Sequence, residues 1–181
     1  MLEEGCVWLS PFGPFYCIFR WDLSSFVYPE PPNPPETLLR YANAQEIGSV
    51  AQGWYEGLRD EPDSPWADYL TKWTPVTAAK WFLDSHKRLG ARFLVAEKEK
   101  LVVGMNGMII EKRSGIGRFF TGVVVRSTER KRGIGSLLLY RSLRDIKAEG
   151  LRNAEVETRD GITASNFLYP KYGGKKHTVQ G

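Results

Sequence analysis

The chain has 181 residues, 42% hydrophobic and 25% charged, with a formal net charge of +4 at pH 7. This length suits one globular domain that buries a core without disulfides or a metal. No run approaches the roughly 20 apolar residues of a membrane span, and the acidic start Met1-Leu2-Glu3-Glu4 is unlike a secretory signal, so we expect a cytoplasmic protein.

Residues 1–36 are predicted to be an N-terminal extension, and residues 37–181 the main domain. The extension begins with a strand-rich stretch, residues 6–26, in which a hairpin turn is expected at 11–14. Residues 29–35, with the sequence PEPPNPP, then read as an extended polyproline spacer.

The two cysteines, Cys6 and Cys17, lie on either side of that expected turn. They would face each other about two positions out of register, so a disulfide would need distortion and their pairing stays open. Neither has a basic neighbour, which argues against a catalytic thiol. His86 and His177 are far apart with no ligand cluster, so no metal site is expected.

The main domain opens with a predicted strand at residues 37–42 and two or three helices. Asn43 with Glu46 resembles a capping box, and Ser64-Pro65 and Thr74-Pro75 each pair a cap with proline at the first helical position. Gly90 reads as a helix stop. The Trp and Tyr residues of these helices are expected in the core, with the wall of a substrate cleft as the alternative.

Residues 91–112 read as two strands, 92–96 and 101–105, joined by a charged turn. A glycine turn at 114–117 leads to a third strand, 119–125, and a short strand follows at 154–158. Between them an amphipathic helix carries Leu138, Leu139, Leu143 and Ile146 at helical spacing.

The segment between the third strand and this helix carries the chemical signal. Val123-Val124-Val125 leads through residues 126–129 into Arg130-Lys131-Arg132-Gly133-Ile134-Gly135-Ser136. The first amides of a helix lack internal partners and lie at the positive end of its dipole. Glycines let an anion approach them, and the cations add full charges. The segment therefore predicts a pyrophosphate site.

Two common phosphate motifs are excluded. No glycine is followed by Lys-Ser or Lys-Thr, as a P-loop requires, and the third glycine of the dinucleotide pattern is absent after Gly135. What remains, Arg-x-x-Gly-x-Gly between strand and helix, resembles the GNAT superfamily of acyl-CoA-dependent N-acetyltransferases. The strands before it, and Leu168-Tyr169-Pro170-Lys171-Tyr172-Gly173 after it, also resemble that family in the same order, over residues 37–176.

The resemblance implies a GNAT fold, an α/β (α+β) architecture whose mixed, mostly antiparallel sheet is flanked by helices. It implies acetyl-CoA as cofactor, with a bulge in the strand before the motif that holds the pantetheine arm, and an amine-bearing acceptor, small molecule or protein. The cofactor-binding residues that it implies are Val123, Val124, Val125, Arg130, Lys131, Arg132, Gly133, Ile134, Gly135 and Ser136.

The resemblance also implies catalytic residues. Tyr169 occupies the tyrosine of the Leu-Tyr-x-Lys motif, whose hydroxyl points at the coenzyme A sulfur, and is the candidate acid. Glu157 matches the glutamate that acts as base in GNAT enzymes acetylating ribosomal-protein N-termini, with Glu111 as a reserve base. As alternatives, Tyr169 is a core aromatic and Glu157 a solvated strand residue paired with Arg159 or Lys171.

Two features depart from the family pattern. Ile162 stands where an asparagine usually contacts the cofactor. Asn166 is the candidate substitute for that asparagine, but its register differs from the family position by one helical turn. After Gly174, residues 175–179 provide at most one strand, where the family has a closing hairpin of two. We hypothesise that the strand-rich N-terminal segment covers the exposed part of the sheet, in its own subunit or swapped into a partner as a homodimer.

Two functions outside this enzyme class stay open. One is a GNAT-like module that binds acyl-CoA without turnover. The other is a basic nucleic-acid-binding domain that uses Arg126, Arg130, Lys131, Arg132 and Lys175.

Overall fold

The computed structural model describes residues 16–59 and 72–178. Predictions for Cys6, the turn at 11–14 and Ser64-Pro65 therefore lie outside the described residues. The strands are β1 (Tyr16–Asp22), β2 (Leu38–Tyr41), β3 (Arg92–Lys98), β4 (Leu101–Glu111), β5 (Ile116–Val125), β6 (Asn153–Arg159) and β7 (Lys175–Thr178). The helices are η2 (Leu23–Ser25), α1 (Ile47–Arg59), α3 (Pro75–Leu89), η3 (Ser127–Glu129), α4 (Ile134–Ala148), η4 (Ala164–Leu168) and α5 (Tyr169–Lys171).

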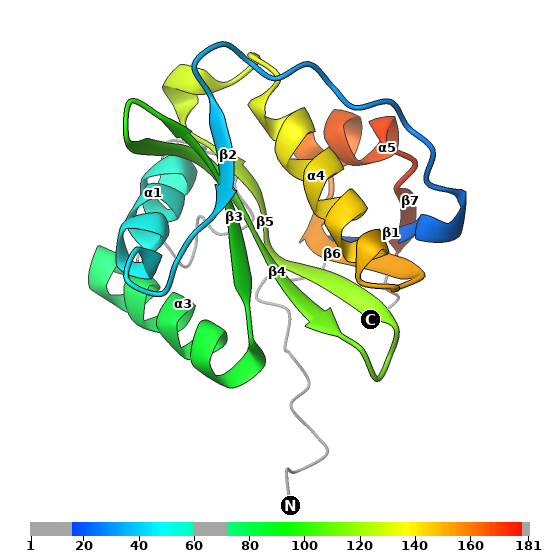
Figure 1. Ribbon diagram of the computed structural model, residues 1–181, viewed down its shortest axis with the longest axis horizontal. Helices are drawn as coiled ribbons and strands as arrows, with labels where there is room; N and C mark the ends of the chain where they lie inside the picture. The colour runs from blue at the N-terminus through cyan, green and yellow to red at the C-terminus, as the bar shows by residue number, and fades with distance from the viewer. Residues whose placement is uncertain (1–15, 60–71, 179–181) are drawn as a thin grey trace, which may run out of the picture.

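The strands form one seven-stranded sheet in the order β2-β3-β4-β5-β6-β1-β7. Every neighbouring pair is antiparallel except β5 and β6, which run parallel. Helices α1 and α3 cover one face, and α4 and α5 lie on the other (Figure 1). The predicted fold class, a mostly antiparallel mixed sheet flanked by helices, is confirmed.

Each face of the sheet has its own apolar core. On the face covered by α1 and α3, Trp54 of α1 is completely buried, and its ring packs on Trp73, Trp81 and Phe82. Under α4, the apolar stripe predicted from its sequence meets the sheet, through Leu138, Leu143, Ile146, Phe119 and Val156. The expected core role is confirmed for Trp54. None of the helices in the described ranges is long and apolar enough to cross a membrane.

The predicted helix signals are present in the structure. The Asn43 side chain accepts from the Glu46 N–H at 3.2 Å, and the Glu46 carboxylate accepts from the Asn43 N–H at 2.9 Å, which is a capping box. Thr74 caps α3 with Pro75 at its start. Gly90 ends that helix in the left-handed region, at φ 64°.

Strand β1 is inserted between β6 and β7, and both pairings are antiparallel. It comes from the predicted N-terminal extension, and β7 is the single strand that residues 175–179 were expected to supply. The hypothesis that the N-terminal segment covers the sheet beside β7 is confirmed for residues 16–22, in the same chain. At this edge of the sheet, β1 and β7 thus stand where the family pattern has a closing hairpin of two strands.

The proline-rich spacer connects β1 to β2 by running along α4 (Figure 1). Near the end of α4, the Lys147 ammonium donates to the Phe26 carbonyl at 3.0 Å. Further back along the helix, Arg144 pairs with Glu30 at 3.3 Å. At its start, the Pro34 ring lies 3.8 Å from where a Cβ on Gly133 would be. The segment from Phe26 to Pro34, which includes most of the spacer, therefore runs along the length of this helix.

Candidate active site

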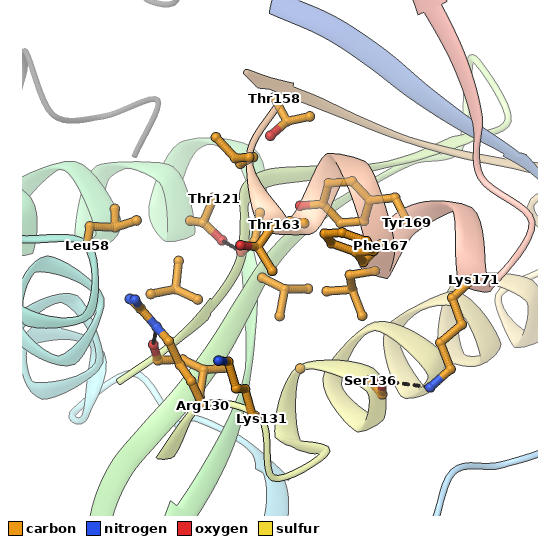
Figure 2. Close-up of a pocket in the computed structure, with 18 of the residues that line it drawn as sticks. Leu58, Thr121, Arg130, Lys131, Ser136, Thr158, Thr163, Phe167, Tyr169 and Lys171 are labelled. Carbon is orange, nitrogen blue, oxygen red and sulfur yellow. Dashed lines mark hydrogen bonds between the residues drawn. The ribbon is translucent and has the colours of Figure 1, made fainter. Parts of the chain in front are cut away.

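The two parallel strands of the sheet separate, and a cavity opens between them. Strands β5 and β6 pair from Ile116 and Asn153 to Phe119 and Val156, and no further. Beyond that point lies a cavity of about 530 Å³ whose lining includes residues 121–125 of β5 and residues 157–158 of β6. Figure 2 shows that side chains from α1, the loop before α4, η4 and α5 also surround it.

Strand β5 carries a bulge at the edge of this cavity. Asn106 pairs with Val123, and Met108 pairs with Phe119. The two β5 residues are four positions apart while their β4 partners are two apart, so β5 has extra residues at this point. Gly122 adopts φ +66° at the bulge. The Thr121 hydroxyl oxygen accepts from the Gly107 N–H at 2.6 Å, which stabilises the irregular backbone. The bulge that the GNAT resemblance implies in this strand is confirmed.

The N-terminus of α4 faces the cavity without a side-chain cap. Gly133, at φ 88°, precedes the helix, and its carbonyl accepts the first helical bond, from Leu137 at 3.0 Å. The amides of residues 134–136 come before that bond and have no acceptor within the helix. A Cβ on Gly135 would lie 3.7 Å from Leu168 and 3.8 Å from Val123, so a larger side chain there would project into the cavity. These features fit a bound pyrophosphate.

The predicted cations differ in how they are placed. Arg130 lines the cavity, and its guanidinium donates to the Val125 carbonyl at 3.0 Å and to the Gly57 carbonyl at 2.8 Å (Figure 2). Lys131 also lines it, with a left-handed backbone at φ 61°. Arg130 therefore joins β5 to α1 as well as placing charge beside the cavity.

Two predicted cofactor-binding residues do not line this cavity. Arg132 pairs with Glu129 at 3.4 Å, and together with Lys98 and Pro34 it lines a second, smaller cavity. The Ile134 side chain is 1% exposed and belongs to the core. The cavity does include Val123, Val124, Val125, Gly133, Gly135 and Ser136.

Tyr169 lies in the wall of the cavity, and its side chain is 2% exposed. Its hydroxyl oxygen would be 3.3 Å from a Cβ built on Gly122, so it reaches the bulge of β5. The expected closing helix starts as a π-helix, in which the Tyr169 N–H donates to the Ala164 carbonyl. Pro170 has no N–H to continue an α-helical ladder, which accounts for the irregular turn.

Glu157 also lines the cavity, from β6, and its side chain is exposed. Because strand side chains alternate, it lies on the opposite face of β6 from the buried Val156 and Thr158. The structure thus brings the candidate acid and the candidate base to one cavity. Their catalytic roles remain predictions.

The other candidates lie elsewhere. Glu111, the reserve base, pairs with Arg118 at 3.5 Å near the far end of the β4–β5 hairpin and does not line the cavity. Asn166 is exposed, donates to the Gly161 carbonyl at 3.0 Å and is likewise outside the lining. Ile162 does line the cavity, so the usual asparagine position is apolar here.

Several lining residues were missed by sequence reasoning. Lys171, whose ammonium donates to the Ser136 hydroxyl at 3.4 Å, stood in the Leu-Tyr-x-Lys motif and was open to prediction. Others carry no local sequence signal, because only the strand separation and the π-turn bring them together; among them are Leu58, Thr121, Thr158, Thr163 and Phe167 (Figure 2).

Other kinds of site find little support in the described residues. Among them, no group of three His, Cys, Asp or Glu side chains could hold a metal ion. Cys17 is a free, buried thiol, and burial raises its pKa, with Asp160 adding to the shift. Such a thiol is a poor nucleophile.

The cations proposed for nucleic acid are mostly engaged within the protein. Arg126 pairs with Glu56 at 2.7 Å and donates to the Val102 carbonyl at 2.8 Å. Arg130 and Arg132 have the contacts described above. These pairs leave less free positive charge than the sequence alone indicates.

Several solved structures of similar fold are named as acetyltransferases. A GCN5-related N-acetyltransferase from Sphaerobacter thermophilus aligns with TM-score 0.68 and 19% identity over 90% of this chain and 48% of its own, so this chain spans about half of that protein. PaiA N-acetyltransferase from Thermoplasma acidophilum, solved with coenzyme A, aligns with TM-score 0.63 and 15% identity over 80% of this chain and 93% of its own.

A third structure, yncA from Salmonella typhimurium with its cofactor acetyl-CoA, gives TM-score 0.60 and 18% identity over 76% of this chain and 79% of its own. Identities this low show a shared fold. No curated protein matches the chain. The model of the acetyltransferase (GNAT) family, however, matches residues 51–173. That match covers more than half of the sequence and includes the bulged strand, the uncapped helix start and Tyr169, so the chain belongs to the GNAT acetyltransferase family.

Proposed function

We propose that this protein is an N-acetyltransferase that transfers the acetyl group of acetyl-CoA to an amine by direct attack in a ternary complex. The observation that carries the proposal is the cavity between β5 and β6, with the uncapped start of α4 on one wall and Tyr169 and Glu157 on others. Two structures of similar fold carry coenzyme A or acetyl-CoA.

The cavity offers distinct groups to the parts of this cofactor. The amides at the start of α4, with Lys131 and Lys171 nearby, suit the pyrophosphate. Beyond Phe119, β5 has no partner strand on the cavity side. The peptide groups of residues 123–125 that bond neither to β4 nor to Arg130 are therefore available to the amides of the pantetheine arm, as a neighbouring strand would be.

Acetyl-CoA supplies the thioester carbonyl carbon that the amine nitrogen attacks. We assign Glu157 to take the proton that the amine loses as the C–N bond forms and then to release it to water. We assign the Tyr169 hydroxyl to give its proton to the sulfur as the C–S bond breaks, and to regain one from water. Each such transfer accelerates a reaction by about 10²–10⁴-fold, and positioning both substrates contributes roughly 7–11 kcal/mol.

Cofactor binding is tested by thermal unfolding with coenzyme A. A ligand that binds only the folded state stabilises it, so we expect the melting temperature to rise with ligand concentration. Gly135→Val should abolish this rise, because its side chain would occupy the space beside Leu168 and Val123. Gly48→Val is the matched control, because Gly48 is also the second residue of a helix but has no atom within 4 Å of its Cβ position. An unchanged rise in Gly135→Val would contradict the assignment of this turn.

Transfer is tested by thiol release from acetyl-CoA with a panel of peptides, polyamines and aminoglycosides. Amine-dependent release, with the acetylated product seen by mass spectrometry, is the expected result. Binding of coenzyme A without transfer to any acceptor would favour the non-catalytic acyl-CoA module.

A further inference from the structure

We propose that Trp21, on the inserted strand β1, is a positioning residue that holds Tyr169 in place for proton transfer. The inference rests on the proposed function, in which Tyr169 protonates the departing sulfur. It makes a residue near the start of the chain part of the active site, although Trp21 does not line the cavity.

The placement of Trp21 is set by the pairing of β1 with β6. In β1, Cys17, Phe19 and Trp21 point into the core beneath α4, while Arg20 points to solvent. Pairing with β6 puts Trp21 opposite Ala154 and Phe19 opposite Val156. Since a slip of one residue would turn Trp21 to the other face, the hydrogen bonds fix which ring meets Tyr169.

The Tyr169 ring is held between two rings of β1. Its centroid is 5.6 Å from that of Trp21 at an interplanar angle of 89°, and 5.4 Å from that of Phe19 at 52°. Trp21 in turn meets Phe119 of β5 edge-on, at 5.8 Å and 69°. Edge-to-face pairs of this kind are directional contacts as well as buried area, so they restrict the orientation of the phenol.

Trp21 also supports the backbone of Tyr169. The Gly174 N–H donates to the Tyr169 carbonyl at 3.0 Å. A Cβ at Gly174 would lie 2.9 Å from the Trp21 ring and 2.8 Å from that carbonyl oxygen. The Trp21 indole therefore packs directly over Gly174, the glycine that anchors Tyr169. Removing the indole would loosen both the Tyr169 ring and the backbone bond from Gly174 to Tyr169.

The contribution of Trp21 comes from its shape. Among the described residues, no hydrogen-bond partner exists for its buried Nε1. A phenylalanine keeps an aromatic edge against Tyr169 and removes an unsatisfied donor, whereas a leucine loses the edge. Proton transfer needs a donor within about 2.6–3.2 Å of its acceptor, so looser packing lowers the rate of the chemical step before it affects cofactor binding.

The test is a double-mutant cycle with steady-state kinetics. Trp21→Leu should lower kcat by about 10- to 100-fold with the KM for acetyl-CoA nearly unchanged. Trp21→Phe should stay close to wild type. In the Tyr169→Phe background, Trp21→Leu should cause no further loss of kcat, because the proton donor is already absent. Phe82→Leu, in the other core, controls for destabilisation alone.

The outcomes separate this inference from the proposal beneath it. If Tyr169→Phe lowers kcat and Trp21→Leu lowers it by the same factor in that background as in the wild type, Trp21 acts independently of Tyr169 and the inference is wrong. Wild-type kcat in Tyr169→Phe would overturn the acid role and the inference together, while leaving cofactor binding to the Gly135→Val experiment. If Trp21→Leu does not fold, Trp21→Met replaces it in the same cycle, since methionine keeps more of the volume and still removes the flat edge.

Discussion

The Arg130 side chain has a structural task alongside any contact with a ligand. Its guanidinium donates to carbonyls of Val125 and Gly57, which belong to β5 and α1. The sequence motif predicts a cation here, but it does not distinguish a cation that binds phosphate from one that braces the wall of the phosphate site. Lys131, the next residue in the lining, shows no hydrogen bond or ion pair to another described residue.

The charge of Glu157 can be tested directly. If Glu157 is the base, its carboxylate must be deprotonated, so the rate falls as low pH protonates the carboxylate. Glu157→Gln should lower kcat/KM by about 10²-fold or more and remove this acidic limb of the pH profile. Glu155→Gln is the matched control, because Glu155 lies on the same face of β6 but pairs with Arg118 and Arg20 outside the cavity. A wild-type profile in Glu157→Gln would leave catalysis to positioning.

At the level of elements, β2 is tied to α4 by a half-buried polar contact. The Tyr41 hydroxyl donates to the Asp145 carboxylate at 2.7 Å, and Asp145 also accepts from Arg141 at 3.0 Å. Burial, then the bond to Asp145, raises the pKa of Tyr41 well above its usual range. The contact therefore stabilises the fold while the phenol is protonated.

Removing this hydroxyl should lower stability in a pH-dependent way. At pH 8, Tyr41→Phe should reduce the free energy of unfolding by about 1 kcal/mol, the usual net value of a hydrogen bond. In the unfolded chain the phenol ionises near pH 10, whereas in the folded chain it does so higher, so the wild type loses stability as pH rises above about 10. The variant should lose less over that range.

Urea unfolding at pH 8 and above pH 10 measures both effects. Tyr140→Phe, on α4, is the control, since the Tyr140 hydroxyl has no hydrogen bond to another described residue. Equal pH dependence in wild type and Tyr41→Phe would show that the contact with Asp145 is not responsible.

Local patterns predicted those elements whose signals are local. Asn43 with Glu46, Thr74 with Pro75, and Gly90 marked helix ends because their side chains or φ angles act within a few residues. The sequence of β1 does not indicate which strands it pairs with, because the backbone N–H and C=O groups that form the pairing are the same in every strand. Only the shortage of strands after Gly174 suggested them. The closing helix that the Leu-Tyr-x-Lys motif resembles is present as η4 and α5, but the motif did not indicate that it starts as a π-helix.

Across the whole molecule, β1 connects β7 to the rest of the sheet. Deleting residues 1–30 should expose unpaired edges of β6 and β7 and remove two rings that pack on Tyr169. We expect aggregation or a changed oligomeric state, with a lower melting temperature. Light scattering after size exclusion, together with thermal unfolding, measures this.

A chain that begins at Tyr16 is the control for this deletion. It lacks residues 1–15 but keeps every residue of β1 that pairs with its neighbours, so it separates the loss of β1 from the loss of the residues before it. If the chain lacking residues 1–30 has the same mass in solution and the same melting temperature as the full chain, the inserted strand is dispensable and the hypothesis is wrong.

The inserted strand also has a consequence for how the protein is made. Arg20 of β1 and Glu155 of β6 contact each other across 135 residues of chain. A ribosome that adds 5–20 residues per second needs on the order of ten seconds to cover that distance. During this time Phe19 and Trp21 have left the ribosome but their partner strand has not been synthesised. Completing the sheet is thus a late step of folding, and these aromatic side chains are a natural target for chaperones until it occurs.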